Sequence, residues 1–231
     1  MKKLAFFALL LAAAPSLCAA PEAPQTLTVR ALTFQPGFPD ELHAHTPEGT
    51  ATAGLFQIKS YLNHESNLLT IKGKHLVFTA KSSPSSATDV NLVYGQLEVP
   101  ATMKSAILLF LPESDAPENH KCQVMAIDDS PKEFPAGSFK VSNFSESPVK
   151  IELEEEATEI APGESKVITK VKYGENQSAS MRAFTKRDDQ WVMISTSSWP
   201  NPGSKRVLQI FYKDLATKEV QLRGVRDVGL R

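Results

Sequence analysis

Histidine, cysteine and methionine give this sequence its only soft metal-ligand chemistry. His43 and His45 occupy alternate positions in ELHAHTPE. On a strand, both imidazoles would lie on one face, an arrangement that suits zinc or copper. A metal site also needs further ligands and groups that orient the rings. No further histidine or cysteine is fixed nearby by the sequence, so we expect no metal and no other cofactor, with His43 and His45 as the only metal candidates.

The remaining soft side chains do not form a recognisable motif. His64 and His75 are isolated, and His120, Cys122 and Met125 lack the spacing of a blue-copper loop. We expect Cys122 on a strand as a small buried side chain, because its only basic neighbour is Lys121 and nothing else would activate the thiol.

Motifs for hydrolysis are also missing. The sequence contains no Gly-x-Ser-x-Gly elbow, and its serines have no recognisable histidine partner. Glu152 and Glu154 alternate with Ile151 and Leu153, which predicts the solvated face of a strand that runs into a turn. Calcium binding at this acidic run is the alternative. We expect a protein that is not an enzyme and has no catalytic residues.

The two tryptophans have different sequence contexts. Trp191 is expected on a strand, and packing in a core is the usual role of such a residue. Trp199 precedes Pro200-Asn201-Pro202-Gly203 at a strand end. Packing is expected there too, but aromatic residues at strand ends also bind glycans or peptides. Trp199 is therefore the candidate for ligand binding.

The N-terminus has the features of a secretory signal peptide. Two lysines, an apolar stretch and small residues follow one another in MKKLAFFALLLAAAPSLCAA. Cleavage after Ala20 would make Pro21 the first mature residue, and cleavage after Cys18 is the alternative. Lipid on Cys18 is not expected, because Leu17 precedes it. We expect residues 1–20 to be removed and the mature chain, without a membrane span, to reach the periplasm, the outer membrane or the cell surface.

Charge and cysteine content limit the partners and the means of stabilisation. The 25 lysines and arginines nearly balance the 26 aspartates and glutamates. This balance argues against a basic surface for nucleic acid or anionic lipid. Beyond the signal sequence only Cys122 remains, so no internal disulfide can form and packing must hold the fold.

Short apolar stretches separated by proline, glycine and serine predict an all-β protein of the immunoglobulin-like β-sandwich type. Expected strands are 27–34, 51–58, 67–71, 75–80, 91–97, 105–111, 122–127, 137–143, 149–153, 165–171, 178–186, 191–197, 206–213 and 220–225.

Two series of similar segments indicate a degenerate duplication. YGQLEVPATMKSAILLFLPES at 94–114 resembles ISTSSWPNPGSKRVLQIFYKD at 194–214, and earlier segments correspond in the same order. We expect two immunoglobulin-like halves, residues 26–115 and 116–231, packed together. Loose similarity between any two sandwich sequences is the alternative.

The stretch KSAILLFLPES is apolar on both faces of its expected strand. Alignment with KRVLQIFYK places Ile107, Leu109 and Leu111 opposite Val207, Gln209 and Phe211. Since monomers rarely expose such a row, we expect Ile107, Leu109 and Leu111 to form an interface. The other half of the chain is the expected cover, and a second subunit is the alternative.

Three segments of the second half resemble small exported proteins of Verrucomicrobia-type Gram-negative bacteria. They are FPAGSFKVSNFSESPV (134–149), IAPGES (160–165) and DQWVMISTSSWPNPGSKRVLQIFY (189–212). The resemblance rests on turn residues and core aromatics, and it implies an exported immunoglobulin-like protein. Some such proteins are associated with type IV pilus-like systems.

We therefore expect a non-enzymatic envelope or periplasmic module that binds or assembles with a protein partner or with itself. The alternatives are a carbohydrate- or metal-binding module and a hydrolase without a recognisable motif.

Overall fold

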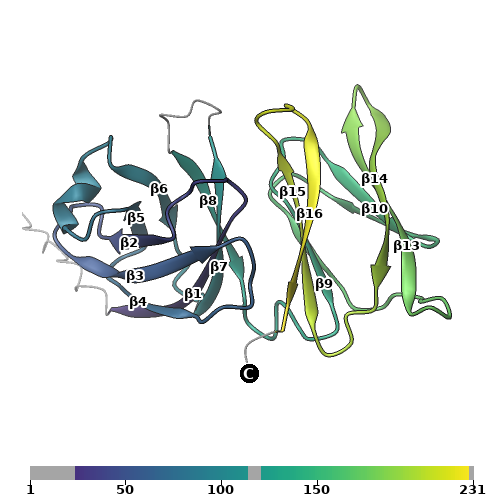
Figure 1. The fold of residues 1–231 in the computed structure, drawn as a ribbon, viewed down its shortest axis with the longest axis horizontal. Helices are drawn as coiled ribbons and strands as arrows, with labels where there is room; N and C mark the ends of the chain where they lie inside the picture. Colours follow the sequence, from purple (N-terminus) through teal and green to yellow (C-terminus); the bar gives the residue numbers. More distant parts are fainter. Residues whose placement is uncertain (1–23, 114–120, 229–231) are drawn as a thin grey trace, which may run out of the picture.

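The computed structural model describes residues 24–113 and 121–228, which form an all-β protein of three sheets (Figure 1). The expectation of an all-β fold is thereby confirmed. The expected signal peptide and His120 lie outside the described residues. Within those residues, no helix is long and apolar enough to cross a membrane.

The first sheet is built by the N-terminal part of the chain and is nearly closed, like a barrel. Its strands are β1 (Gln25–Thr33), β2 (Glu41–His45), β3 (Thr52–Lys59), β4 (Asn67–Ile71), β5 (His75–Thr79), β6 (Val93–Glu98), β7 (Ser105–Pro112) and β8 (Cys122–Asp128). They follow the order β6-β5-β2-β3-β1-β7-β8, and β4 pairs with β1.

A seam between the two edge strands β6 and β8 completes this barrel-like sheet. A Cβ atom on Gly95 of β6 would lie 2.7 Å from the carbonyl oxygen of Cys122 on β8. Only glycine therefore lets the two backbones approach so closely. The sheet curls until its edges meet, which leaves little exposed edge for pairing with other chains.

The expectation of a plain sandwich in the first half was wrong. β1 changes partners along its length: its first residues pair antiparallel with β4, and Ala31 and Leu32 pair parallel with β3. On its other side, β1 pairs parallel with β7. These pairings join all the strands into one curved sheet where a sandwich would have two.

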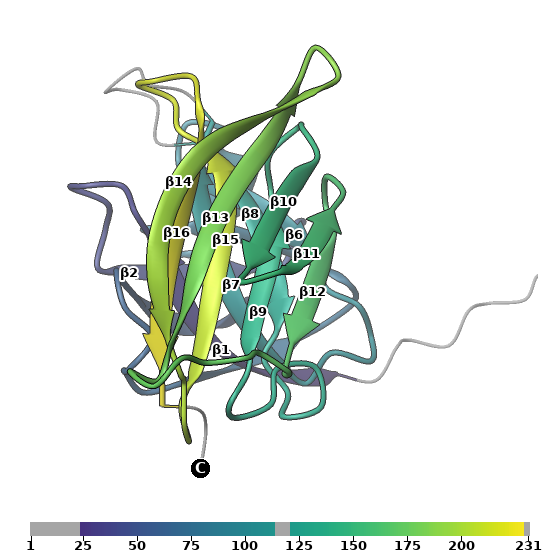
Figure 2. The ribbon, with the colours of Figure 1, turned by 90° about the vertical axis from the view of Figure 1, so that its right-hand side faces the viewer.

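The C-terminal part forms two sheets that face each other (Figure 2). The inner sheet, in the order β12-β9-β15-β16, contains β9 (Phe139–Asn143), β12 (Ser165–Ile168), β15 (Arg206–Lys213) and β16 (Val220–Asp227). The outer sheet, in the order β11-β10-β13-β14, contains β10 (Val149–Leu153), β11 (Glu156–Ile160), β13 (Ser178–Arg187) and β14 (Gln190–Pro200). Side chains from both sheets, including Phe139, Ile151 and Phe211, form the core between them.

Two strands and one helix were not expected from the sequence. β2 (ELHAH) and β11 (EATEI) each contain a single large apolar residue, Leu42 and Ile160, which is too few to mark a strand in the sequence. Residues 81–89, which lie between two of the expected strands, contain a 3-10 helix, Pro84–Thr88. Pro84 lies at its start, and the Ser86 hydroxyl donates to the Ser83 carbonyl at 2.6 Å.

The two parts of the chain share an arrangement of three strands. β1 runs parallel to β7, which pairs antiparallel with β8. In the inner sheet, β9 runs parallel to β15, which pairs antiparallel with β16. β8 begins after the expected boundary at 115/116 but belongs to the first sheet.

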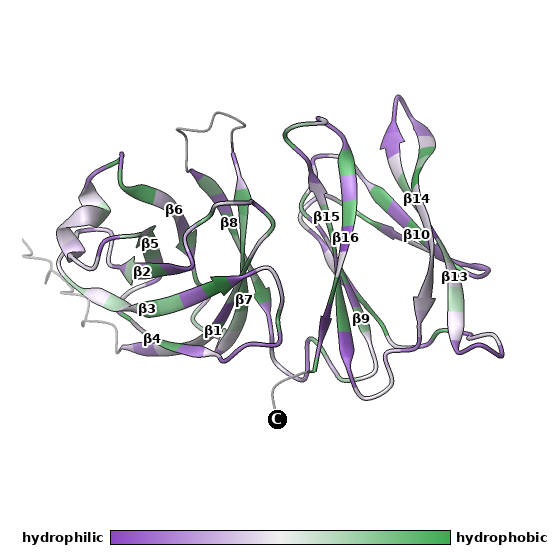
Figure 3. Cartoon of the chain, in the orientation of Figure 1, coloured by the Kyte–Doolittle hydropathy of each residue, from purple (hydrophilic) through white to green (hydrophobic). Residues whose placement is uncertain are grey.

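Both apolar faces of β7 are covered within the chain. Ala106, Leu108 and Phe110 point into the core of the first sheet. Ile107, Leu109 and Leu111 lie in a second cluster, together with Leu208 and Ile210 of β15. The strands on both sides of this layer carry hydrophobic segments (Figure 3).

The sequence alignment of these strands was wrong by one residue. Val207 and Phe211 face the core of the two C-terminal sheets, whereas Leu208 and Ile210 face β7. Ile107 therefore corresponds to Leu208, because side chains alternate between the faces of a strand.

A buried ionic cluster accompanies the apolar contact. Arg30 of β1 donates to Asp129, which follows β8, and to Asp227 of β16. Arg206 of β15 donates to the same two carboxylates. All four side chains are 4 % exposed or less. Two guanidinium groups thus face two carboxyl groups in a space that is shielded from solvent.

Candidate functional site

His43 and His45 lie side by side on β2, with ring centroids 6.0 Å apart. The Nε2 atom of His45 lies 3.0 Å from the Lys81 carbonyl oxygen, which requires a donor, and Nδ1 lies 3.1 Å from the Thr52 hydroxyl. The neutral ring thus uses both nitrogens within the protein. Among the described residues, no group of three or more His, Cys, Asp or Glu side chains could hold a metal.

The stability of the fold is expected to depend on His45 below neutral pH. Burial, followed by the charge of His43, lowers the pKa of His45 from its ordinary 6.5. The unfolded chain therefore takes up this proton at a higher pH than the folded one. The contribution of His45 to stability is present above pH 6.5 and is lost as the pH falls through the lower folded-state pKa.

We expect His45→Gln to flatten the pH dependence of the unfolding free energy between pH 7 and 5. One protonation changes this slope by at most about 1.4 kcal/mol per pH unit. Urea unfolding across this range measures it, with His75→Gln, at an exposed position of β5, as the control. A slope in His45→Gln equal to that of the parent would contradict the prediction.

Cys122 is buried, as the sequence predicted. Its side chain is 3 % exposed and packs with Val124 in the core of the first sheet. Burial, with a smaller effect from the Glu113 charge, raises the pKa of the thiol to about 12. The thiolate needed for nucleophilic or metal chemistry is therefore strongly disfavoured at neutral pH.

Native Cys122 is expected to resist alkylation. At pH 8, iodoacetamide should modify the peptide containing Cys122 at least a hundredfold more slowly in buffer than in 8 M urea, because the folded chain offers neither access nor thiolate. Mass spectrometry of timed digests gives both rates. Equal rates would mean that the thiol is accessible.

Glu152 and Glu154 make separate contacts. Glu152 lies within β10, and Glu154 lies in the turn that follows it. Glu152 pairs with Lys150 at 2.7 Å and with Arg182 at 3.0 Å, on the solvent side of the outer sheet. The hydrogen bond from Lys150 lowers the pKa of Glu152. Glu154 adopts a positive φ of 52° in the turn and accepts a hydrogen bond from the Ser180 amide.

One of the two tryptophans packs as expected and the other does not: Trp199 lies in the core, which leaves no support for its ligand-binding alternative, whereas Trp191 lies outside the core. Trp199 is 5 % exposed and stacks on Phe139 at 4.7 Å, so it is buried in the core and offers no surface for a ligand. Trp191 lies on the outer face of the outer sheet, where Lys150 sits over its ring. A β-bulge explains the difference: the register shifts between Ala183 and Phe184, which reverses the face of β14 on either side.

The bulge gives the outer face an apolar group at one end of β14. The ammonium of Lys150 lies 4.4 Å from the ring centroid of Phe184 and 5.2 Å from that of Trp191. Met193, paired with Phe184 across the strands, is 56 % exposed. Val192 pairs with the buried Thr185, so its side chain lies on the other face of the strand, where it is 37 % exposed.

β14 is also the terminal strand of the outer sheet. It has 11 residues, and the sequence from 190 to 204 contains no charged residue. Charges, proline, short length and bulges are the usual protection of sheet edges. Of these, β14 has the bulge and, at its last position, Pro200, and its segment 195–199 continues regularly between them.

Other terminal strands are better protected. β11 contains Glu156 and Glu159, β12 has only four residues, and β16 contains Arg223 and Arg226. β4 is uncharged, but it has five residues, and its backbone packs against Gly54 of β3. Among the described strands, β14 thus presents the longest uncharged edge.

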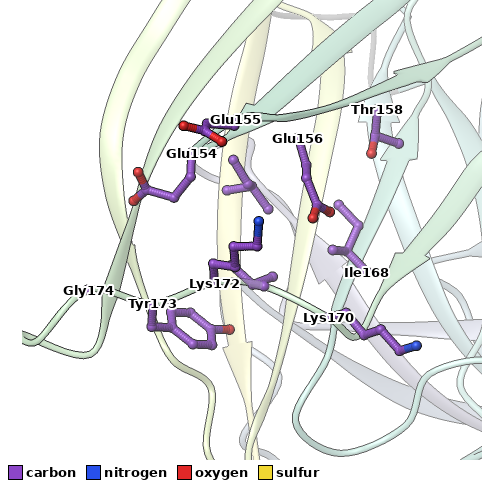
Figure 4. A pocket seen from close by; sticks show the side chains of 11 residues that line it. Glu154, Glu155, Glu156, Thr158, Ile168, Lys170, Lys172, Tyr173 and Gly174 are labelled. Carbon is purple, nitrogen blue, oxygen red and sulfur yellow. The ribbon is translucent and has the colours of Figure 1, made fainter.

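A cavity of about 340 Å³ opens between the β10–β11 hairpin and the segment after β12. Leu153, Ile168 and Val171 form its apolar part. Figure 4 shows Glu156 and Lys172 turned towards this space, with the ring of Tyr173 at its lower edge. An amphipathic small molecule would fit such a lining, which combines apolar contact with charges of both signs.

The expected interface residues are not available to a separate partner. Ile107 and Leu109 are fully buried and Leu111 is 6 % exposed, all within the cluster that joins β7 to β15. Among the described residues, the candidate surfaces that this section has identified are the edge of β14, the outer face beside it and the cavity.

Comparison with known proteins adds no function. A scan against models of protein families gives no match, and a search of curated proteins gives no significant similarity. Functional inference therefore depends on the geometry of this chain.

Proposed function

We propose that this chain is a non-enzymatic, exported module of the cell envelope that binds or assembles with protein by strand addition at β14. In strand addition, an extended segment pairs with an exposed sheet edge through main-chain hydrogen bonds. The signal-like N-terminus supports export to the periplasm or cell surface. The resemblance noted above makes a pilus-like or cell-surface complex the setting of this proposal.

The proposal also includes a more specific description of the all-β fold. We infer an immunoglobulin-like duplication in which the first copy has curled into one sheet. The shared arrangement of β1, β7 and β8 with β9, β15 and β16 supports this inference. Binding modules with such folds act through edges and loops, and the fold by itself selects no ligand.

The observation that carries the proposed function is the uncharged, 11-residue terminal strand β14 with exposed Val192 and Met193 at one end. An edge of this kind pairs readily with another strand, and natural proteins protect it unless it is used. The apolar side chains beside it would add contact area next to the main-chain hydrogen bonds.

Site-specific photo-cross-linking in the native envelope tests this function. A photo-reactive residue at Met193 should link to a protein, whereas one at Leu68 should not. Leu68 is a matched control, since it is 63 % exposed on β4, the other uncharged terminal strand. The Met193 product should be lost when Ser197→Lys places a charge on the edge.

Cross-linking that is equal at the two positions, or that survives Ser197→Lys, would contradict strand addition at β14. The absence of any product at Met193 would contradict it as well.

A small-molecule site is the second candidate, favoured by the cavity beside Tyr173. A carbohydrate would combine ring contacts with Tyr173 and hydrogen bonds to Glu156 and Lys172. Glycan-array binding that is lost in Tyr173→Ala and kept in Tyr61→Ala, an exposed tyrosine elsewhere, would support it. Absence of binding by the parent protein would reject it.

A further inference from the structure

The free edge of β14 has features that identify its partner, provided that the proposed strand addition is correct. We propose that β14 pairs antiparallel with β14 of a second copy of this chain, about a two-fold axis near Ser197. Two outer sheets of four strands would then form one continuous sheet across the dimer.

Charge is the first argument for a second copy. In a strand pair about a two-fold axis, the residue on the axis meets its own counterpart, so a charge at that position would meet a like charge. β14 contains none, and its self-pairing is free of such repulsion. A different partner selected by electrostatic complementarity would require charges on this edge, and the strand does not supply them.

Side-chain size is the second argument. The segment 195–198 reads Ser-Thr-Ser-Ser, so small hydroxyl side chains occupy both faces of the strand. Thr196, Ser197 and Ser198 are exposed. An axis at Ser197 places Thr196 of each copy opposite Ser198 of the other. Such pairs of hydroxyl residues are among the favourable cross-strand neighbours.

The apolar end of the edge is consistent with this register. In an antiparallel pair centred on Ser197, Met193 of one copy lies near Pro200 and Asn201 of the other. The contact would cover part of a side chain that is 56 % exposed in the single chain. The bulge at Ala183/Phe184 lies outside the segment 195–199, which leaves a pairing region of ordinary strand length.

The accessible position of the outer sheet permits such a dimer. The inner sheet faces the first sheet, and β14 lies at the far layer of the molecule, away from β7 (Figures 1 and 2). The copies could therefore meet at β14 without disturbing the buried ionic cluster.

Single cysteine variants test the pairing. Ser195, Thr196, Ser197 and Ser198 are each replaced by cysteine, and disulfide-linked dimer is measured on non-reducing gels under mild oxidation. The yield should peak at Ser197→Cys and fall on both sides, because only the residue on the axis faces itself. The parent chain gives the baseline for its own cysteines, and Ser180→Cys, exposed on the adjacent strand β13, is the matched control.

Light-scattering chromatography of the purified parent should show a dimer. Ser197→Lys should weaken the dimer at least tenfold in dissociation constant, because the two lysines would face each other on the axis. Ser180→Lys should leave the dimer unchanged. Circular dichroism and thermal unfolding establish that both variants retain the parent fold.

The outcomes separate this inference from the proposed function. A parent that is monomeric at all concentrations, or a dimer unaffected by Ser197→Lys, overturns pairing between copies. If the Met193 cross-link then identifies a different protein, strand addition at β14 stands and only the identity of the partner changes. A disulfide yield that is equal at all four positions also overturns the single register.

Discussion

Replacement of Arg30 by methionine is expected to destabilise the fold by about 3–5 kcal/mol, the cost of breaking a buried charge pair. Methionine fills similar space but leaves Arg206 as the one arginine of the cluster that donates to Asp129 and Asp227. It also removes the donor to the Leu62 carbonyl, 2.9 Å from the guanidinium. Urea unfolding of parent and variant gives the difference in free energy.

An exposed ion pair is the control for this experiment. Arg182→Met breaks the contact to Glu152, but Arg182 is 55 % exposed, so the loss should be at most about 1 kcal/mol. Adding Asp129→Asn to Arg30→Met should recover part of the stability, since it restores equal numbers of opposite charges. A single variant within 1 kcal/mol of the parent would show that the cluster is not a structural requirement.

The two carboxyl groups of the same cluster respond differently to acid. Burial raises the pKa of Asp129 above its ordinary 3.8, against the opposing charges of Arg30 and Arg206, so Asp129 is protonated before Asp227 as the pH falls. Burial alone would raise the pKa of Asp227, but hydrogen bonds and charge from Arg30 and Arg206 hold it below its ordinary 3.8. A carboxylate with a lowered pKa stabilises the fold above its unfolded-state pKa and loses this contribution as the pH falls through the folded-state value. The contribution of Asp227 should therefore persist down to about pH 4.

Leu109→Gln is expected to cost about 2–4 kcal/mol, because an amide without partners replaces core volume. Leu109 is fully buried between β7 and β15. Leu68→Gln, at an exposed position, should change stability by less than about 0.5 kcal/mol. Chemical unfolding measures both, and light scattering should give Leu109→Gln the same mass as the parent.

Two other results would revise this account of β7. A folded Leu109→Gln protein with parental stability would mean that this face is not packed in solution. A folded variant of lower mass would mean that the face contacts another subunit.

The sequence predicted those features that arise from local patterns. Alternation and turn residues located most strands, and the unbroken apolar run of β7 led correctly to a second covered face. β2 was missed because Leu42 is the only large apolar residue in its five positions, although polar and apolar residues alternate along it. The curled first sheet could not be predicted, because β1 exchanges β4 for β3 midway along its length, and such pairing leaves no trace in the strand itself.

The candidate site was only partly visible in the sequence. The absence of charge from 190 to 204 can be read from the sequence, but it indicates an unprotected edge only when β14 is known to be the terminal strand of its sheet. The β-bulge cannot be predicted from the sequence. Without it, Trp191 and Trp199 would lie on the same face of β14, because they are eight residues apart. Arg30, Asp129, Arg206 and Asp227 are single charges in separate segments, and only the fold brings them together.

The ionic cluster also constrains the order in which the chain can fold. Arg30 and Asp227 are separated by 197 positions, so the ion pair between them can form only after β16 has been synthesised. During synthesis, the first sheet can form once β8 has emerged, yet the row Ile107, Leu109 and Leu111 stays bare until β15 arrives. The growing chain thus carries an exposed apolar surface for about a third of its synthesis, from the end of β8 at residue 128 to the start of β15 at residue 206. Truncation before β15 would make this exposure permanent, and such a product is expected to aggregate or to be degraded.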